Sequence, residues 1–170
     1  MKIRTIRLCA LIIIVSCLSG CSFFETLVGT EYGIYMRNDT DKRIIVWGTY
    51  NQTLGTRLPE ERPAGELIVP SADLDISPFN FIMAQGHDWT KSLSDTDTIR
   101  VFVFDSEKYE ETDWSAIRDQ YLILRRYDFT QADLDILGWH IAYPPSSEMK
   151  DIKMWPPYEE AIKNAESLKP

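Results

Sequence analysis

Short runs of β-branched and aromatic residues, separated by turn-forming residues, dominate the chain from residue 31 to residue 105. Such runs are typical of β-strands, and the stretch 51–65, with its prolines and glycines, is typical of a loop. The turn residues from Asn38 to Asp41 predict that the first two strands form a hairpin. The predicted strands cover residues 31–38, 43–50, 66–69, 79–84 and 98–105.

The strand at 98–105 has the most hydrophobic pattern of these. Five of the six residues from Ile99 to Phe104 are apolar, which predicts that both faces of the strand are covered. We therefore expect Phe102 and Val103 in the core. Three tryptophans also lie at positions within predicted elements that are typical of the core: Trp47, Trp114 and Trp139.

Hydrophobic residues repeat at helical spacing only in the last third of the chain. Thr112 or Asp113 is the expected N-cap of the first helix there. Thr130 and Asp133 form a capping-box pattern, which predicts a second, short helix that ends at Gly138. The predicted helices begin at residues 114, 130 and 157, and further strands are expected at 122–129 and 139–144.

This order of elements predicts a mainly β or α+β fold. Strands dominate the first two-thirds of the chain, and helices follow without regular βαβ alternation. We therefore expect an antiparallel, β-sandwich-like domain with two or three short helices in its C-terminal third. The alternative is an α+β layer with the helices on one face of the sheet.

The first 20 residues have the layout of an export signal. Lys2, Arg4 and Arg7 precede an apolar run from Leu8 to Leu18, and small residues follow. The run is too short to cross a bilayer, which takes roughly 20 apolar residues. The sequence LSGC at 18–21 resembles the lipobox of bacterial lipoproteins. This resemblance implies that residues 1–20 are removed and that Cys21 is acylated, with palmitate-type chains as the membrane anchor.

Cleavage before Cys21 would leave residues 21–30 as a lipidated tether and residues 31–170 as a single globular domain. Cys9 and Cys17 lie in the removed segment, so the domain has no disulfide and depends on its hydrophobic core. Loss of three basic residues lowers the net charge from −8 to −11, which argues against nucleic acid as a partner. The alternative is an ordinary signal peptide that happens to contain cysteines.

A second resemblance covers about half of the chain after Cys21. It is carried by Arg126–Asp128, the pair Asp133-Leu134, Trp139 and the segment Tyr143–Pro145. These residues resemble the C-terminal part of a family of small, uncharacterised lipoproteins of Bacteroides-type bacteria. The resemblance implies a Gram-negative envelope and brings no catalytic residue with it.

Motifs of common enzymes do not occur in the sequence. It has no Gly-x-Ser-x-Gly elbow, no His-Glu-x-x-His motif and no thiol beyond Cys21. His87 and His140 are 53 positions apart without a nearby ligand pair, so structural roles are expected rather than zinc binding. Adjacent acids such as Glu60 and Glu61 are typical of a solvated surface, and acid–base chemistry on glycosides is the remaining enzymatic alternative. We expect no catalytic residue, no cofactor and no metal.

Aromatic residues in loop-like segments are candidates for binding. Trp89 and Trp155 could stack on the apolar C–H faces of sugars, and a strip that ends at Tyr158 could contact a partner protein. The alternative is that these rings fill the core or cover a proline. Thr98, within Asp97-Thr98-Ile99, matches a short acceptor pattern for O-glycosylation in Bacteroides-type bacteria.

The expected function is that of a non-catalytic cell-envelope lipoprotein that acts as an interaction or assembly module. Acylated Cys21 would hold it in the lipid bilayer, and an envelope protein or a glycan would be its partner. The alternative is a glycan-binding lipoprotein that uses loop aromatics. Ser22, rather than aspartate, resembles the sorting signal for the outer membrane. The missing acidic run after Ser22 favours the periplasmic face over the cell surface.

Anchoring can be tested by substitution of the lipobox cysteine. Cys21→Ser should abolish lipid labelling and move the protein from the membrane to the soluble fraction. Cys17→Ser is the matched control and should change neither result, because it lies in the removed segment. Membrane association of the Cys21→Ser variant in high salt would contradict the lipoprotein assignment.

Overall fold

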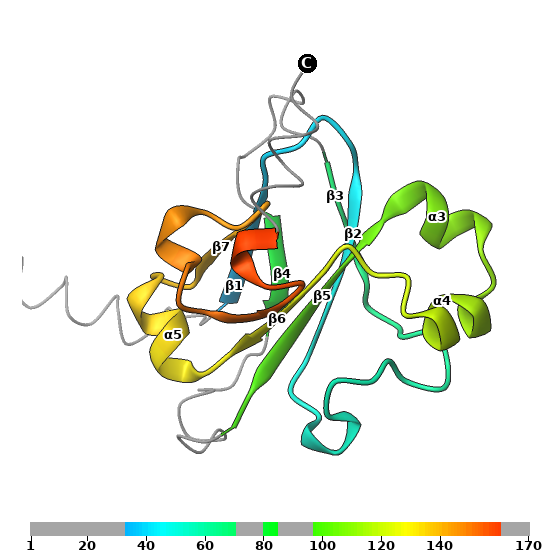
Figure 1. Cartoon of the computed structure of the whole chain (residues 1–170), viewed down its shortest axis with the longest axis horizontal. Helices are drawn as coiled ribbons and strands as arrows, with labels where there is room; N and C mark the ends of the chain where they lie inside the picture. Colours follow the sequence, from blue (N-terminus) through cyan, green and yellow to red (C-terminus); the bar gives the residue numbers. More distant parts are fainter. Residues whose placement is uncertain (1–32, 71–79, 85–96, 161–170) are drawn as a thin grey trace, which may run out of the picture. The chain divides into compact units, whose positions relative to one another are not determined.

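β-Strands and short helices form an α+β fold in the computed structural model, which describes residues 33–70, 80–84 and 97–160 (Figure 1). The strands are β1 (Gly33–Asn38), β2 (Ile44–Thr49), β3 (Leu67–Val69), β4 (Asn80–Ala84), β5 (Ile99–Asp105), β6 (Arg125–Phe129), β7 (His140–Tyr143) and β8 (Lys153–Trp155). The helices are α3 (Ser106–Glu111), α4 (Trp114–Gln120) and α5 (Gln131–Ile136), with short 3-10 helices at Gln52–Leu54 and Ser147–Met149. The expected fold class is confirmed.

The larger sheet contains five antiparallel strands in the order β3-β2-β5-β6-β8. β5 lies at its centre, and Phe102 and Val103 are fully buried there. This confirms the prediction that both faces of the strand are covered. Because side chains alternate along a strand, Val103 faces one side of the sheet while Phe102 and Phe104 face the other.

The smaller sheet has the order β4-β1-β7, with β1 antiparallel to β4 and parallel to β7. The hairpin predicted between the first two strands is therefore wrong, because β1 and β2 belong to different sheets. The turn is present, but it leads the chain from one sheet to the other. The side-chain amide of Asn38 donates to the carbonyl oxygens of Lys42 (2.7 Å) and Pro70 (2.9 Å) and so fixes this corner. Apolar side chains of both strands then share one core instead of lying side by side in one sheet.

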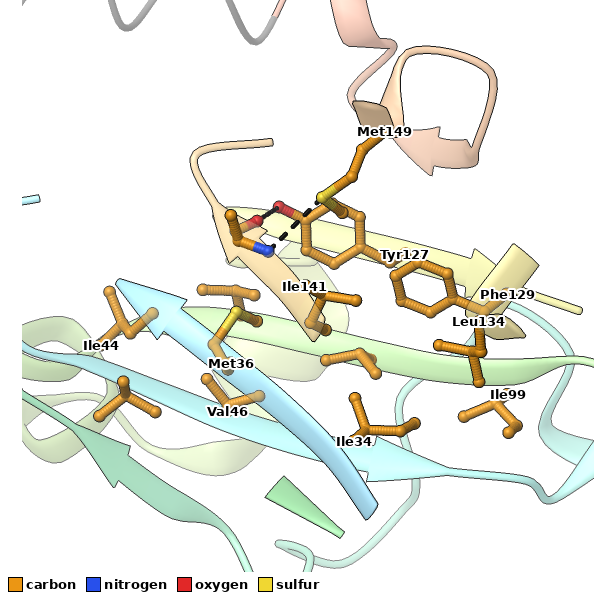
Figure 2. Close-up of a cluster of buried hydrophobic side chains, with 14 residues drawn as sticks. Ile34, Met36, Ile44, Val46, Ile99, Tyr127, Phe129, Leu134, Ile141 and Met149 are labelled. Carbon is orange, nitrogen blue, oxygen red and sulfur yellow. Dashed lines mark hydrogen bonds between the residues drawn. The ribbon is translucent and has the colours of Figure 1, made fainter. Parts of the chain in front are cut away.

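The main hydrophobic core contains buried side chains from both sheets and from α5 (Figure 2). Tyr127 is fully buried in it, and its hydroxyl donates to the carbonyl oxygen of Ala142 at 2.8 Å. The amide of Ala142 in turn donates to the sulfur of Met149 at 3.5 Å. These contacts link β6 of the larger sheet to β7 of the smaller one. Burial raises the pKa of the Tyr127 phenol far above its ordinary value, so this group stays neutral.

A second hydrophobic cluster covers the opposite face of the larger sheet. Phe102 and Phe104 of β5 pack there against Tyr109 of α3, Ile117 of α4 and Leu58 of the loop after β2. Figure 1 shows α3 and α4 together on one side of β2 and β5. The smaller sheet thus covers one face of the larger sheet, and the helices and a loop cover the apolar part of the other face.

Most predicted elements are confirmed with small shifts at their ends. α5 begins with the predicted capping box, in which Thr130 Oγ1 accepts from the amide of Asp133 at 3.2 Å and Asp133 Oδ2 accepts from the amide of Thr130 at 2.8 Å. Asp113 occupies the N-cap position of α4 without a side-chain capping bond. The described part of the helix expected from Pro157 consists of its first turn, where the amide of Glu160 donates to the Pro157 carbonyl oxygen at 3.1 Å. α3 and β8 are additional elements that the hydrophobic pattern does not predict.

Trp139 is partly exposed, which corrects the expectation that it is buried in the core. Its indole nitrogen donates to Asp135 Oδ1 at 3.0 Å, and its ring packs at the border of the main core. Trp47 and Trp114 are likewise partly buried at the border of the second cluster, and the Trp114 indole donates to the carbonyl oxygen of Pro59 at 3.1 Å. A large ring with one polar N–H group is well placed at such a border, because the N–H group can reach an acceptor.

Phe102 provides a test of the second cluster. Phe102→Ala should lower the free energy of unfolding by about 3–5 kcal/mol, because the side chain is fully buried and a cavity would remain. Ile136→Ala is the control: this side chain is 82% exposed, so little change is expected. Chemical denaturation would measure both. Equal stability of the two variants would mean that Phe102 does not contribute to the core.

Candidate functional site

An open groove of about 830 Å³ lies on the helix-covered side of the larger sheet. Its walls come from the loop at residues 54–60, the end of α4 and two neighbouring strands. The residues from the last three elements are Arg118, Asp119 and Tyr121 at the end of α4, Arg126 of β6 and Trp155 of β8. We call this site the Arg126 groove.

Strand alternation places Arg126 at the groove. Tyr127 is directed into the core between the sheets, so Arg126 faces the opposite side, where it lies directly across from Trp155 on β8 and from Phe102 on β5. Asp128 has the same orientation as Arg126, and it pairs across the ladder with Arg100 of β5. This face of the sheet is therefore apolar beneath α3 and α4 and polar beside the groove.

Arg126 is held in place by a network of hydrogen bonds. Its Nε and Nη2 atoms donate to the two carboxylate oxygens of Asp128 at 3.0 and 3.1 Å. Its Nη1 atom donates to the Tyr121 hydroxyl at 2.7 Å, and that hydroxyl donates to the carbonyl oxygen of Thr56 at 2.8 Å. The side chains of Arg126 and Asp128 are only 10% and 2% exposed, so the network is largely shielded from water. One buried carboxylate thus orients both a guanidinium and a phenol of the groove.

Asp128 also interacts with a second buried guanidinium. Arg100 Nε lies 3.6 Å from Asp128 Oδ1, a distance that allows an ion pair but not a hydrogen bond. The buried Nε and Nη1 atoms of Arg100 have no hydrogen-bond partner in the described part of the chain. Two guanidinium groups therefore share one carboxylate, and this buried trio carries a net positive charge.

The ionisation of the groove residues follows from these contacts. Burial lowers the pKa of the Arg126 guanidinium, but its hydrogen bonds to Tyr121 and Asp128 outweigh burial and raise the pKa above the ordinary value. Burial raises the pKa of the Tyr121 phenol, although the neighbouring Arg126 acts in the opposite direction. At neutral pH the groove therefore presents a charged guanidinium beside a neutral phenol.

Trp155 and Tyr121 form an aromatic wall of the groove. Their rings meet edge to face, with centroids 5.1 Å apart and planes inclined by 67°. Trp155 is 40% exposed, although every residue of the neighbouring strand β6 is buried. An exposed indole that is braced by a second ring offers a flat apolar surface to a ligand.

Side chains of α4 fasten the loop wall of the groove. Trp114 donates to the carbonyl oxygen of Pro59, Arg118 Nη1 to that of Glu60 at 3.2 Å, and Tyr121 to that of Thr56. Three points of the loop are thus bonded to α4 or to the residue that follows it, and these bonds fix the loop wall of the groove.

The structure places the residues singled out from the sequence in different environments. Trp155 lies in the Arg126 groove, whereas Tyr158 is partly buried and is not among the lining residues. Thr98 is partly buried just before β5, and its carbonyl oxygen accepts from Gln52 Nε2 at 2.8 Å. Cys21, Trp89 and His87 lie outside the described residues.

His140 lies at the start of β7, where its ring stacks on Tyr35 with centroids 5.1 Å apart. Its Nδ1 atom is 2.5 Å from the carbonyl oxygen of Gly138. Within the described ranges, no three histidine, cysteine or acidic side chains lie close enough together to hold a metal ion. In the same ranges, no helix has the length and apolar character needed to span a bilayer.

Sequence reasoning missed Arg126, Tyr121 and Asp128 as site residues. The available signal was an arginine and an aspartate two positions apart within a predicted strand, since this spacing puts both side chains on one face. The spacing of Trp114, Ile117 and Tyr121 in the sequence predicts that Tyr121 lies on the apolar face of a helix. Tyr121 instead follows the end of α4 in the left-handed conformation, with φ of 53°, which directs its hydroxyl toward Arg126.

Asp128 can be tested as the residue on which this network depends. Asp128→Asn should lower the free energy of unfolding by about 3–5 kcal/mol, because two buried guanidinium groups would lose the one carboxylate that pairs with them among the described residues. Asp119→Asn is the matched control. Asp119 pairs with Arg118 at 2.8 Å, but its side chain is 63% exposed, so no measurable change is expected. Thermal and chemical denaturation of both variants would check this, and equal effects would contradict a special role of Asp128.

No protein-family model, curated protein or solved structure matches this chain significantly.

Proposed function

We propose that the protein is a non-catalytic cell-envelope lipoprotein that acts as an interaction module and takes its ligand in the Arg126 groove. The observation that carries this proposal is the network from Asp128 through Arg126 and Tyr121 to Thr56. The network orders the Arg126 and Tyr121 side chains when the protein folds, so their conformational entropy is not lost when a ligand binds. A ligand therefore meets a site that is already ordered, which favours affinity.

The chemistry of the groove supports binding rather than catalysis. Its described lining contains no histidine, cysteine or serine that could act as a nucleophile or base. Its two carboxylates belong to Glu60 and Asp119, and Asp119 is paired with Arg118. Arg126 and Tyr121 are held in their charged and neutral forms respectively by their surroundings, so neither is suited to exchange protons near neutral pH.

Attachment to the envelope is the second part of the proposal. Acylated Cys21 would hold the protein at the outer membrane, with the domain on the periplasmic side. The partner would then be an envelope protein or a glycan near that membrane. The acidic composition of the chain supports an anchor of this kind, because a chain of net charge −8 gains nothing from anionic lipid headgroups.

Glycan binding is the second candidate function, and Trp155 is the observation that favours it. The partly exposed indole lines the same groove as several hydrogen-bonding residues, among them Thr56, Glu60 and Asp119. Sugars present an apolar C–H face next to hydroxyl groups. A wall of this kind can contact both parts of a sugar ring at once.

Binding through the groove can be tested with Trp155→Ala. Purified protein would be applied to a glycan array and, separately, to an envelope extract, and bound ligands would be compared with those of the unchanged protein. The substitution should weaken the specific ligand about tenfold or more, as is typical when a central tryptophan of an interface is removed.

Tyr50→Ala is the control for this experiment. Tyr50 is also an exposed aromatic residue, at 49%, but it does not line the groove. Its substitution should leave binding unchanged. A ligand that both variants retain at full affinity would contradict the groove as the binding site.

A further inference from the structure

We propose that the Arg126 groove recognises an acidic saccharide, with the ligand carboxylate bound by Arg126 and a sugar ring packed on Trp155. This inference rests on the proposed function, because it takes the groove to be the ligand site, and it names the class of ligand. Three features of the groove carry it: the unused donors of Arg126, the local charge and the aromatic wall.

Arg126 has hydrogen-bond donors left over. A guanidinium group carries five N–H bonds in a planar fork. Three of them are used, by the two oxygens of Asp128 and the hydroxyl of Tyr121, and the described residues provide no other acceptor. The two that remain are one on each terminal nitrogen, at the end of the side chain that lines the groove. A carboxylate matches two such donors, because its two oxygens can accept both bonds.

The charge around Arg126 also favours an anion. Three guanidinium groups and two carboxylates line the groove, which leaves one net positive charge in a chain whose total is −8. Arg118 is paired with Asp119, whereas Arg57 forms no side-chain hydrogen bond or ion pair with any residue that the structure describes. Behind the wall, Arg100 and Arg126 share the single carboxylate of Asp128. An anionic group on the ligand would offset this excess.

The aromatic wall distinguishes a sugar from a simple anion. Tyr121 contacts Trp155 edge to face and holds it next to Arg126, which lies directly across the β6–β8 ladder. A sugar acid could then use both residues, its ring on the indole and its carboxylate on the guanidinium. Free phosphate would use the guanidinium alone. The groove volume of about 830 Å³ is also in the range typical of sites for small organic ligands.

Calorimetric titration of the full chain in detergent micelles would test this proposal. The probes are the trisaccharides of galacturonic acid and glucuronic acid, their methyl esters, and inorganic phosphate. Each ester keeps the rings and removes the charge. At least one acid should bind, and its ester should bind about tenfold more weakly or worse, because the charge-assisted hydrogen bonds to Arg126 are lost.

Variants of groove residues would separate the contribution of the positive charges from that of the aromatic ring. Arg126→Lys should weaken the acid by about tenfold or more, because an ammonium group cannot bind a carboxylate with two parallel bonds. Arg57→Gln is a second test in case Arg126→Lys fails to fold, because Arg57 is exposed and its substitution should not affect folding. It should weaken the acid but not its ester. Trp155→Ala should weaken the acid and any residual binding of the ester.

Other outcomes would overturn this inference without deciding against the proposed function. Equal affinity for acid and ester would mean that the groove binds a neutral glycan. Capture of an envelope protein that depends on Trp155, with no saccharide bound, would mean that the groove is a protein-binding site. Binding of phosphate that is indifferent to Trp155→Ala, again with no saccharide bound, would mean an anion site without sugar recognition. Failure of every probe and of every groove-dependent partner would overturn both proposals.

Discussion

The larger sheet must bury both of its faces, and the rest of the structure follows from how it does so. β5 and β6 carry buried side chains on both sides, so each face requires a cover. The smaller sheet and α5 cover one face with an apolar core. α3, α4 and the loop after β2 cover only part of the other face, and the remaining part is polar. The groove lies at this boundary, where an apolar layer ends and buried charges begin.

A buried carboxylate makes this boundary stable. Asp128 is almost inaccessible to solvent, and the cost of burying its charge is offset by two hydrogen bonds from Arg126 and by the nearby Arg100. Arg126 is therefore rigid in spite of its long side chain. Tyr121 is fixed by Arg126 and itself holds the loop at Thr56. The same interaction thus stabilises the fold and orders the groove, which links the energetics of folding to the geometry of binding.

The function proposed for the protein combines a binding site with a cellular location. The location is inferred from a signal-like N-terminus. The site is built from three segments that are far apart in the sequence: the loop at 54–60, the end of α4, and the β6–β8 ladder. A groove built in this way can change its specificity through the loop while the sheet beneath it stays the same. Recognition of an acidic sugar would use the rigid part, Arg126 and Trp155, as its centre and the loop residue Arg57 as its edge.

The sequence by itself determined the local structure of this protein. The apolar run at 99–104 predicted a strand that is buried on both faces, and Thr130 with Asp133 predicted the start of α5, because these signals depend on neighbouring residues alone. It also drew attention to Trp155 as an aromatic residue outside the predicted elements. The resemblance of the N-terminus to a lipoprotein signal is likewise a local pattern, and it concerns residues outside the described ranges.

Only the tertiary structure decided which strands pair and which side chains meet. The turn at Asn38 is a local feature, but whether it closes a hairpin or leads to a second sheet depends on distant partners such as Pro70. β8 has little hydrophobic pattern of its own and forms a strand because β6 offers it backbone partners. Arg126, Asp128 and Arg100 acquire their roles when β5 and β6 align in register, and Tyr121 joins them because α4 ends beside β6. Contacts between residues distant in sequence are set by the packing of the whole chain, and local patterns carry no record of them.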